Sequence, residues 1–315
     1  MLRVRFCDNA DTIVKEKSYE KKYFQVIDTQ FLDIFLPSHK EYKIVEEWEE
    51  ADICIVGTQH TDNSLLREDE INIFFSLENF SAGRTHYKHL NTFGRLENPL
   101  IKLYIYNDVI EPTTINIPYI FPAIYQRIKY FNKLNDINSK LYYEKAREFY
   151  NKMDTSFEKK KFCLFISQNM LNPNKNIIVK MLSTLGQIDS LQQLAIFYPN
   201  LQNSNCHNGF ELLKLFNQYK FIICFENSKT EGYITEKIFN VFLAKSIPIY
   251  DGDPKVNNFI HKGSYLPFDD KIMKKVEMLK DNKTLYNAII NKPKVKELDY
   301  TLINKNFDSL VNLKT

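Results

Sequence analysis

Residues 221–254 have the sequence FIICFENSKTEGYITEKIFNVFLAKSIPIYDGDP, and this stretch decides the fold. Two apolar, β-branched runs within it, FIICF and SIPIY, have the length and composition of buried strands. Between them, TEKIFNVFLA has the spacing of a helix with one buried face. A strand, a helix and a second strand predict a βαβ unit, in which the strands are parallel and the crossover is right-handed.

Polar residues follow the first of these predicted strands. Ligands of open parallel sheets bind beyond the carboxyl ends of the strands. We therefore expect one crevice to collect these polar side chains: Glu226, Asn227, Tyr233, Glu236 and Lys237. Thr235 occupies a helix N-cap position, which brings the first-turn amides and the positive end of the helix dipole to the crevice. The pattern predicts an anion site that suits a diphosphate.

The side chains of this crevice differ in what they can bind. Lys237 adds a full positive charge for phosphate, and the amide group of Asn227 can donate to phosphate as well. Glu236 accepts hydrogen bonds and therefore suits ribose hydroxyls. The spacing is equally compatible with ordinary first-turn helix charges at Glu236 and Lys237 and with an Asx turn at Asn227. Spacing alone leaves both interpretations open.

The elements FEN, GYITEKI and AKSIPIYDGDP, in this order and spacing, resemble the signature of the α1,3/4-fucosyltransferases, glycosyltransferase family 10. The resemblance implies an α/β fold of GT-B type, with two Rossmann-like domains facing a central cleft. It also implies that the donor is GDP-fucose. Asn227 and Tyr233 would contact its diphosphate. Glu236 would bind the ribose, and Lys237 the ribose or the phosphate.

One position departs from the family pattern, because a tryptophan is usual where this chain has Asp251. Asp251-Gly252-Asp253 also imitates the Asp-x-Asp motif of another glycosyltransferase class, whose carboxylates hold a divalent cation on the diphosphate. A carboxylate pair followed by Pro254 at a strand end is, however, commonly part of a turn. A lysine and a helix terminus can also balance the leaving group without a metal. We favour the turn, and expect no obligatory metal or other cofactor.

Two further segments extend the resemblance more loosely. KFCLFISQN, residues 161–169, predicts a strand before a loop and a helix, and Lys175 stands where the family usually has an arginine that binds the diphosphate. INIFF, residues 71–75, predicts a strand that leads to Glu78, which resembles the proposed general base of the family. An inverting transfer needs such a base, because the acceptor hydroxyl must lose its proton. The alternatives are an exposed loop lysine and one of many exposed glutamates.

The length of 315 residues exceeds the usual limit of a single core, so two domains are expected. We place an acceptor-binding α/β domain at residues 1–157 and a donor-binding α/β domain at 158–315, ending in a tail helix. The net charge of +3 combines many lysines with nearly as many acids, which does not favour nucleic-acid binding. Lysine runs such as residues 159–161 allow a weak contact with an acidic membrane surface.

The five cysteines form no CxxC pair and mostly fall in apolar runs, which indicates reduced core thiols. The chain begins at once with the strand-like LRVRFCD and has no apolar run long enough to span a bilayer. These features favour a cytoplasmic protein, either free or peripheral at the inner membrane face.

Three functions remain open. The first is a metal-independent, inverting transfer of L-fucose from GDP-fucose to a galactose- or N-acetylglucosamine-containing glycan, such as lactose or N-acetyllactosamine, in α1,3 or α1,4 linkage. The second is a GT-B enzyme that uses another nucleotide sugar. The third is an inactive module that binds a glycan or a nucleotide.

Overall fold

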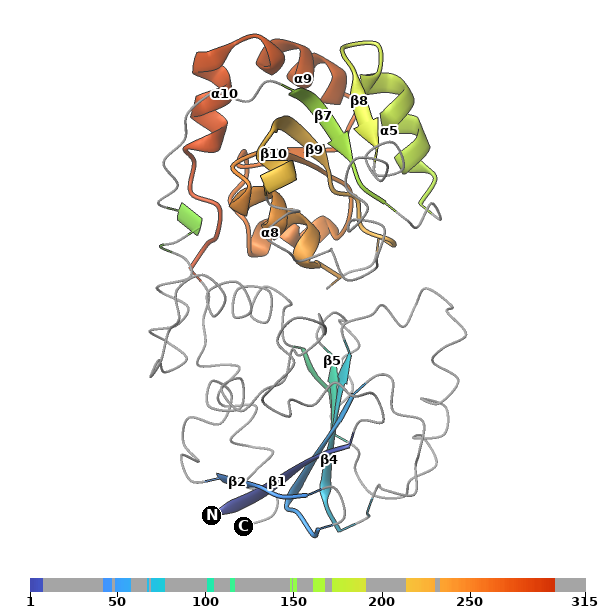
Figure 1. Ribbon diagram of the computed structural model, residues 1–315, viewed down its shortest axis with the longest axis vertical. Coiled ribbons are helices and arrows are strands. Elements are labelled where there is room, and N and C mark those ends of the chain that lie inside the picture. The colour runs from blue at the N-terminus through green and yellow to red at the C-terminus, as the bar shows by residue number, and fades with distance from the viewer. Residues whose placement is uncertain are drawn as a thin grey trace. The chain divides into compact units, whose positions relative to one another are not determined.

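The structure is a computed structural model that describes residues 1–7, 42–46, 49–57, 67, 69–76, 101–104, 114–116, 148, 150–151, 161–167, 172–190, 214–229 and 233–297. The chain folds into two compact units, Met1–Tyr143 with Asp299–Thr315, and Glu144–Leu298. Each unit contains one β-sheet (Figure 1), and paired strands within both sheets are parallel. The predicted α/β class is confirmed.

The sheet of the first unit has six strands in the order β2-β1-β3-β4-β5-β6. These strands are β1 Leu2–Cys7, β2 Tyr42–Ile44, β3 Ile53–Gly57, β4 Ile71–Ser76, β5 Ile101–Tyr104 and β6 Thr114–Asn116. Parallel strands form near-continuous apolar runs because both of their faces are usually covered. ICIVG in β3 and the INIFF part of β4 fit this pattern, and Val4 and Ile53 make a buried pair between β1 and β3.

A buried ion pair ties β1 to the start of β4. The Arg5 side chain has no exposed surface, and its Nε donates to Glu70 Oε2 at 2.8 Å. The other carboxylate oxygen of Glu70 accepts from the backbone amide of Ala51 at 3.0 Å. Arg67 Nη1 also lies 3.6 Å from Glu70 Oε1. Because the Arg5 and Glu70 side chains are both removed from water, each helps to compensate the buried charge of the other.

The sheet of the second unit has five strands in the order β11-β10-β9-β7-β8. These strands are β7 Lys161–Phe165, β8 Ile188–Ser190, β9 Tyr219–Ile223, β10 Ile247–Tyr250 and β11 Leu266–Pro267. Its helices within the described residues are α5 Asn174–Leu182, α8 Glu236–Leu243, α9 Ile272–Lys280 and α10 Lys283–Ile290, with a 3₁₀ helix, η6, at Pro254–Asn258.

The predicted βαβ unit is confirmed by β9, α8 and β10, since β9 and β10 pair in parallel with Phe221 opposite Ile247. The helix is shorter than the sequence pattern suggested. It ends at Leu243, and Lys245 adopts a left-handed conformation with φ 55°. The amides of Lys245 and Ser246 donate to the carbonyls of Phe242 and Val241, which is the Schellman arrangement that closes a helix.

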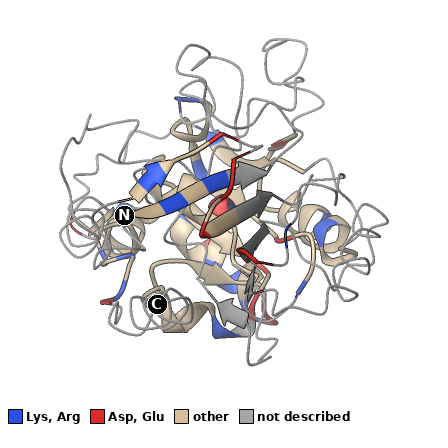
Figure 2. Ribbon diagram, turned by 90° about the horizontal axis from the view of Figure 1, so that it is seen from below, with Lys and Arg blue, Asp and Glu red and all other residues tan. Residues whose placement is uncertain are grey.

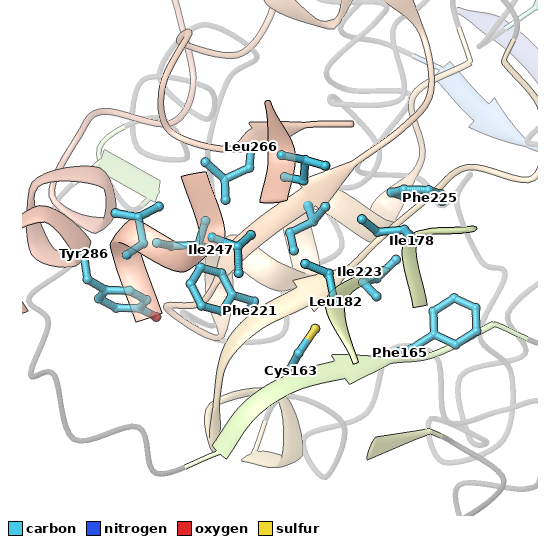
Figure 3. Close-up of a cluster of buried hydrophobic side chains, with 14 of the residues drawn as sticks. Cys163, Phe165, Ile178, Leu182, Phe221, Ile223, Phe225, Ile247, Leu266 and Tyr286 are labelled. Atoms are coloured by element: carbon cyan, nitrogen blue, oxygen red, sulfur yellow. The ribbon is translucent and has the colours of Figure 1, made fainter. Parts of the chain in front are cut away.

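A hydrophobic cluster on one face of this sheet joins β7, β9 and β10 to the helices α5, α9 and α10 (Figure 3). Alternate residues of a strand share a face, and accordingly Phe221, Ile223 and Phe225 all enter this cluster. The buried side chains of α8, such as Ile238 and Phe242, are not part of it.

Three cysteines have buried side chains. Cys54, Cys163 and Cys224 are buried, as their apolar surroundings in the sequence predict, and Cys163 and Cys224 are free. Burial raises the pKa of the Cys163 and Cys224 thiols, because a thiolate loses its hydration there. Both side chains therefore remain neutral thiols at pH 7.

The border between the two units falls after Tyr143, upstream of the boundary predicted between residues 157 and 158. Interactions between segments far apart in the sequence explain the difference. The Asn151 side chain accepts from the amide of Val295 at 3.1 Å and donates to its carbonyl at 3.1 Å, and the Tyr150 ring packs on Phe239. Residues 299–315 group with the first unit rather than extending the second, and the tail helix predicted there lies outside the described residues.

Basic and acidic segments are interspersed along the described ribbon (Figure 2), as the near balance of lysines and acids suggests. Within the described residues, none of the helices combines the length and apolar character that crossing a membrane requires.

Candidate active site

The candidate site lies where the strand order of the second sheet reverses. The chain leaves β7 toward β8 on one side, whereas β9 leads to β10 and β11 on the other side. The carboxyl ends of strands at such a switch point border a crevice in which open α/β sheets bind ligands. Ser167 follows β7 there, while Glu226 and Asn227 follow β9.

Lys175 and Asn227 meet at this crevice. Lys175 belongs to the first turn of α5, its side chain is fully buried, and its Nζ donates to Ser167 Oγ at 2.9 Å and to Asn227 Oδ1 at 3.2 Å. The alternative of an exposed loop lysine is therefore wrong. An ammonium group only donates, so the carbonyl oxygen of Asn227 faces Lys175. The amide nitrogen of Asn227 has no protein acceptor within the described residues and remains available to a ligand.

Glu226 organises the other side of the crevice. It is fully buried, and its carboxylate accepts from the amide and the hydroxyl of Thr235, both at 2.8 Å, and from Lys237 Nζ at 3.1 Å. Burial raises the pKa of this carboxyl group, while the Lys237 ammonium and the Thr235 donors oppose the rise. The sequence placed Glu226 at the crevice but gave it no role.

The N-terminus of α8 is fixed by these contacts. Thr235 is the N-cap residue, as predicted, and its side chain accepts from the Lys237 amide at 3.4 Å. Lys237 Nζ donates to Thr235 Oγ1 at 2.9 Å and forms an ion pair with Glu226. Burial disfavours the charge on Lys237, but the carboxylates of Glu226 and Glu236 raise its pKa well above the usual value. The charge of Lys237 is thus already compensated within the protein.

Tyr233 and Glu236 complete the predicted set. Tyr233 is almost fully buried immediately before the N-cap segment. Glu236 is the first residue of α8, with its side chain 25% exposed and its Oε1 at 3.9 Å from Lys237 Nζ. The structure therefore brings Lys175 to Asn227 and Lys237 to Glu236. Glu78 lies outside the described residues, although the strand expected to lead to it is present as β4.

The two carboxylates of the Asp251-Gly252-Asp253 segment have protein partners. Asp253 is the N-cap of η6 and accepts from the Lys255 amide at 2.7 Å, as the turn interpretation predicts. Asp251 instead accepts from Lys229 Nζ at 2.9 Å and from Asn174 Nδ2 at 2.8 Å. Across the described residues, no group of three or more His, Cys, Asp or Glu side chains is arranged to hold a metal ion.

Gly252 has no room for a side chain. A Cβ atom at this position would lie 2.3 Å from the Tyr250 hydroxyl and 2.7 Å from Glu226 Cγ. The glycine therefore lets β10 close against the buried carboxylate that holds Lys237.

Comparison with solved structures identifies the fold class of the chain. A structure described as "Crystal Structure of alpha1,3-Fucosyltransferase" aligns with 100% of this chain and 91% of its own, at a TM-score of 0.65 and 18% identity. A second one, of the same kind of protein with GDP-fucose, aligns at a TM-score of 0.63 and 17% identity. With its two parallel sheets, the chain has the GT-B fold of glycosyltransferases.

A family model matches residues of the second unit. Residues 155–296 match the model described as "Glycosyltransferase family 10 (fucosyltransferase) C-term". This part of the chain, which contains the whole described crevice, is therefore similar to the C-terminal domain of glycosyltransferase family 10.

Curated relatives align over shorter stretches. A putative fucosyltransferase of Acanthamoeba polyphaga mimivirus is 29% identical over 167 residues, covering 50% of this chain and 28% of the relative. An alpha-(1,3)-fucosyltransferase of Helicobacter pylori is 31% identical over 120 residues, covering 36% and 24%. A 4-galactosyl-N-acetylglucosaminide 3-alpha-L-fucosyltransferase of Mus musculus is 33% identical over 91 residues, covering 27% and 25%. The matches span about a quarter of the length of these relatives.

Proposed function

We propose that this chain transfers L-fucose from GDP-fucose to a glycan hydroxyl, with the nucleotide bound at the switch point of the second unit. The observation that carries the proposal is the meeting of Lys175 and Asn227 beside the capped N-terminus of α8, inside the segment that matches the model of glycosyltransferase family 10. These groups are those that a nucleoside diphosphate needs: cationic and amide donors for phosphate, and a partly exposed carboxylate, Glu236, for ribose hydroxyls.

The same groups suit the chemistry of the leaving group. As the bond to fucose breaks, negative charge develops on the GDP oxygens, and donors fixed before the reaction stabilise it at little reorganisation cost. Lys175 is held by Ser167 and Asn227, and Lys237 by Glu226 and Thr235, so both ammonium groups are fixed in advance. We further propose that Glu78 removes the proton of the attacking hydroxyl, which a positioned carboxylate can do.

The acceptor in this proposal is a glycan that contains galactose or N-acetylglucosamine, joined in α1,3 or α1,4 linkage. The name of the mouse relative, which specifies a galactosyl-N-acetylglucosaminide and a 3-alpha linkage, supports this choice. We also propose a cytoplasmic location, for which the free, buried thiols of Cys163 and Cys224 are the support.

The test is a release assay on the purified chain in the presence of EDTA. It uses a panel of nucleotide sugars with lactose and N-acetyllactosamine as acceptors, and it measures free nucleotide and glycosylated product. We expect GDP-fucose to be the one nucleotide sugar of the panel that is turned over. Its GDP should be released only when an acceptor is present. Turnover of another donor would favour the second GT-B candidate. Nucleotide binding without turnover of any donor would favour an inactive module.

A further inference from the structure

A second ion pair lies at the same edge of the sheet, outside the predicted site residues. Asp251 directly follows β10, and its carbonyl accepts from the Glu226 amide at 2.8 Å, so it is adjacent to the crevice that begins at Glu226. Its side chain is 3% exposed. Lys229, two positions beyond Asn227 in the loop after β9, donates to Asp251 Oδ1 at 2.9 Å.

The carboxylate of Asp251, which itself follows β10, links the loop after β9 to the start of α5. One oxygen binds Lys229 of the loop after β9, and the other accepts from Asn174 at the start of α5 at 2.8 Å. Asn172 approaches the same oxygen at 3.5 Å and also donates to the Glu226 carbonyl. Lys175, which binds Asn227, is the residue after Asn174. The Lys229 ammonium is therefore anchored to the turn that carries Lys175.

The two partners of this pair differ in exposure. The Lys229 side chain is 57% exposed, whereas that of Asp251 is almost fully buried. An ammonium group carries three donors, and Asp251 is the acceptor that Lys229 has within the described residues. A cation that is fixed by a buried carboxylate but open on its other side can donate to an anion without first losing its orientation.

We propose that Lys229 is a further phosphate-binding residue of the nucleotide site and that Asp251 is the residue that positions it. The inference rests on the proposed function, since it requires a nucleoside diphosphate at the switch point. It also gives a role to Asp251, which stands where a tryptophan is usual in the family that the chain resembles, because a tryptophan would provide no carboxylate for Lys229.

The experiment compares the affinities of the full chain for GDP and for guanosine by calorimetry. For Lys229→Ala we expect an approximately tenfold weaker GDP affinity, as for the loss of one charge-assisted contact, and an unchanged guanosine affinity. Lys229→Arg should restore most of the GDP affinity. The matched control is Lys161→Ala, because Lys161 is a 43% exposed lysine of an ion pair with Asp189 at the amino end of β7. We expect its GDP affinity to equal that of the wild type.

Asp251→Asn tests the positioning role, because the amide removes the charge while keeping the size of the side chain. We expect GDP affinity to fall as in Lys229→Ala, with no further loss in the double variant, since both changes remove the same contact. Tighter GDP binding by Asp251→Asn would overturn the positioning role, because the carboxylate would then act only by repelling phosphate. Melting temperatures identify any variant that fails to fold.

The outcomes separate this inference from the proposed function. If the wild type binds GDP and Lys229→Ala binds it equally well, or loses GDP and guanosine affinity alike, the role of Lys229 is overturned while the proposed function stands. If the wild type binds another nucleoside diphosphate instead, the proposed donor is wrong. The role of Lys229 is then decided by the same comparison between that nucleotide and its nucleoside.

Discussion

At the scale of single residues, Lys175 is the cation with the strongest constraint on its position. Its Nζ is shared between Ser167 and Asn227, which come from the ends of different strands. We expect Lys175→Met, which keeps the aliphatic stem, to weaken GDP binding by roughly 1.5 to 3 kcal/mol. Calorimetric titration with GDP measures the loss, and circular dichroism checks the fold. A folded variant with wild-type affinity would exclude Lys175 from the phosphate site.

Lys237 differs from Lys175, because it compensates a buried carboxylate. Lys237→Met should lower both GDP affinity and the free energy of unfolding, each by roughly 1.5 to 3 kcal/mol, since Glu226 is left buried without its cation. Adding Glu226→Gln removes the stranded charge. We therefore expect the double variant to be more stable than Lys237→Met alone in urea unfolding, with GDP affinity still reduced. A double variant less stable than Lys237→Met would contradict the ion pair.

The sequence predicted these residues unequally. The N-cap role of Thr235 follows from local spacing, and the resemblance to family 10 pointed to Lys175, Asn227 and Lys237. The contacts of Glu226 and Asp251 could not be predicted, because they depend on partners from other segments, such as Asn174 and Lys229 for Asp251. A strand-end glutamate or aspartate has the same appearance in a sequence whether it faces solvent or a buried lysine.

At the scale of elements, the βαβ unit was predictable and its surroundings were not. The apolar, β-branched composition of FIICF and SIPIY suffices to predict β9 and β10, because continuous apolar runs mark buried parallel strands. The reversal of strand order at β7 and β9, which creates the crevice, has no local signal. The border of the compact units after Tyr143 has no local signal either, because the contacts of this region come from far along the chain, such as those between Asn151 and Val295.

The end of α10 provides a prediction about pH. The buried Lys294 donates to the carbonyls of Ile289, Ile290 and Lys292, which closes the C-terminus of this helix. Burial lowers the pKa of Lys294 from 10.5 to about 8. Because the folded-state pKa is depressed, holding the proton below about pH 8 costs stability, and this cost disappears as the pH rises toward 10.5.

The melting temperature of the wild type minus that of Lys294→Met should therefore increase between about pH 8 and pH 10.5. The methionine variant lacks the titrating group and provides the baseline. Differential scanning calorimetry over this range measures the difference. A difference that is constant or decreases with pH would show that Lys294 is charged without penalty in the folded state.

At the scale of the whole molecule, the two units have separate sheets and separate stabilising pairs. The buried pair of Arg5 and Glu70 belongs to the first unit, whereas the crevice proposed to bind the nucleotide belongs to the second. We expect Glu70→Gln to lower the stability of the first unit by roughly 3 to 5 kcal/mol, because the buried guanidinium loses its carboxylate. GDP affinity at 25 °C should be unchanged, since no residue of the crevice is touched.

Thermal unfolding with and without GDP distinguishes the units, because a ligand stabilises only the folded unit that binds it. Glu70→Gln should lower a transition that GDP does not shift, and should leave the GDP-dependent transition in place. Glu49→Gln is the matched control, since Glu49 pairs with Arg3 at the surface, where the side chains are 35% and 41% exposed, and it should leave both transitions nearly unchanged. A single transition that is lowered by Glu70→Gln and raised by GDP would mean that the units unfold as one, and that the stability of the first unit limits the proposed nucleotide site.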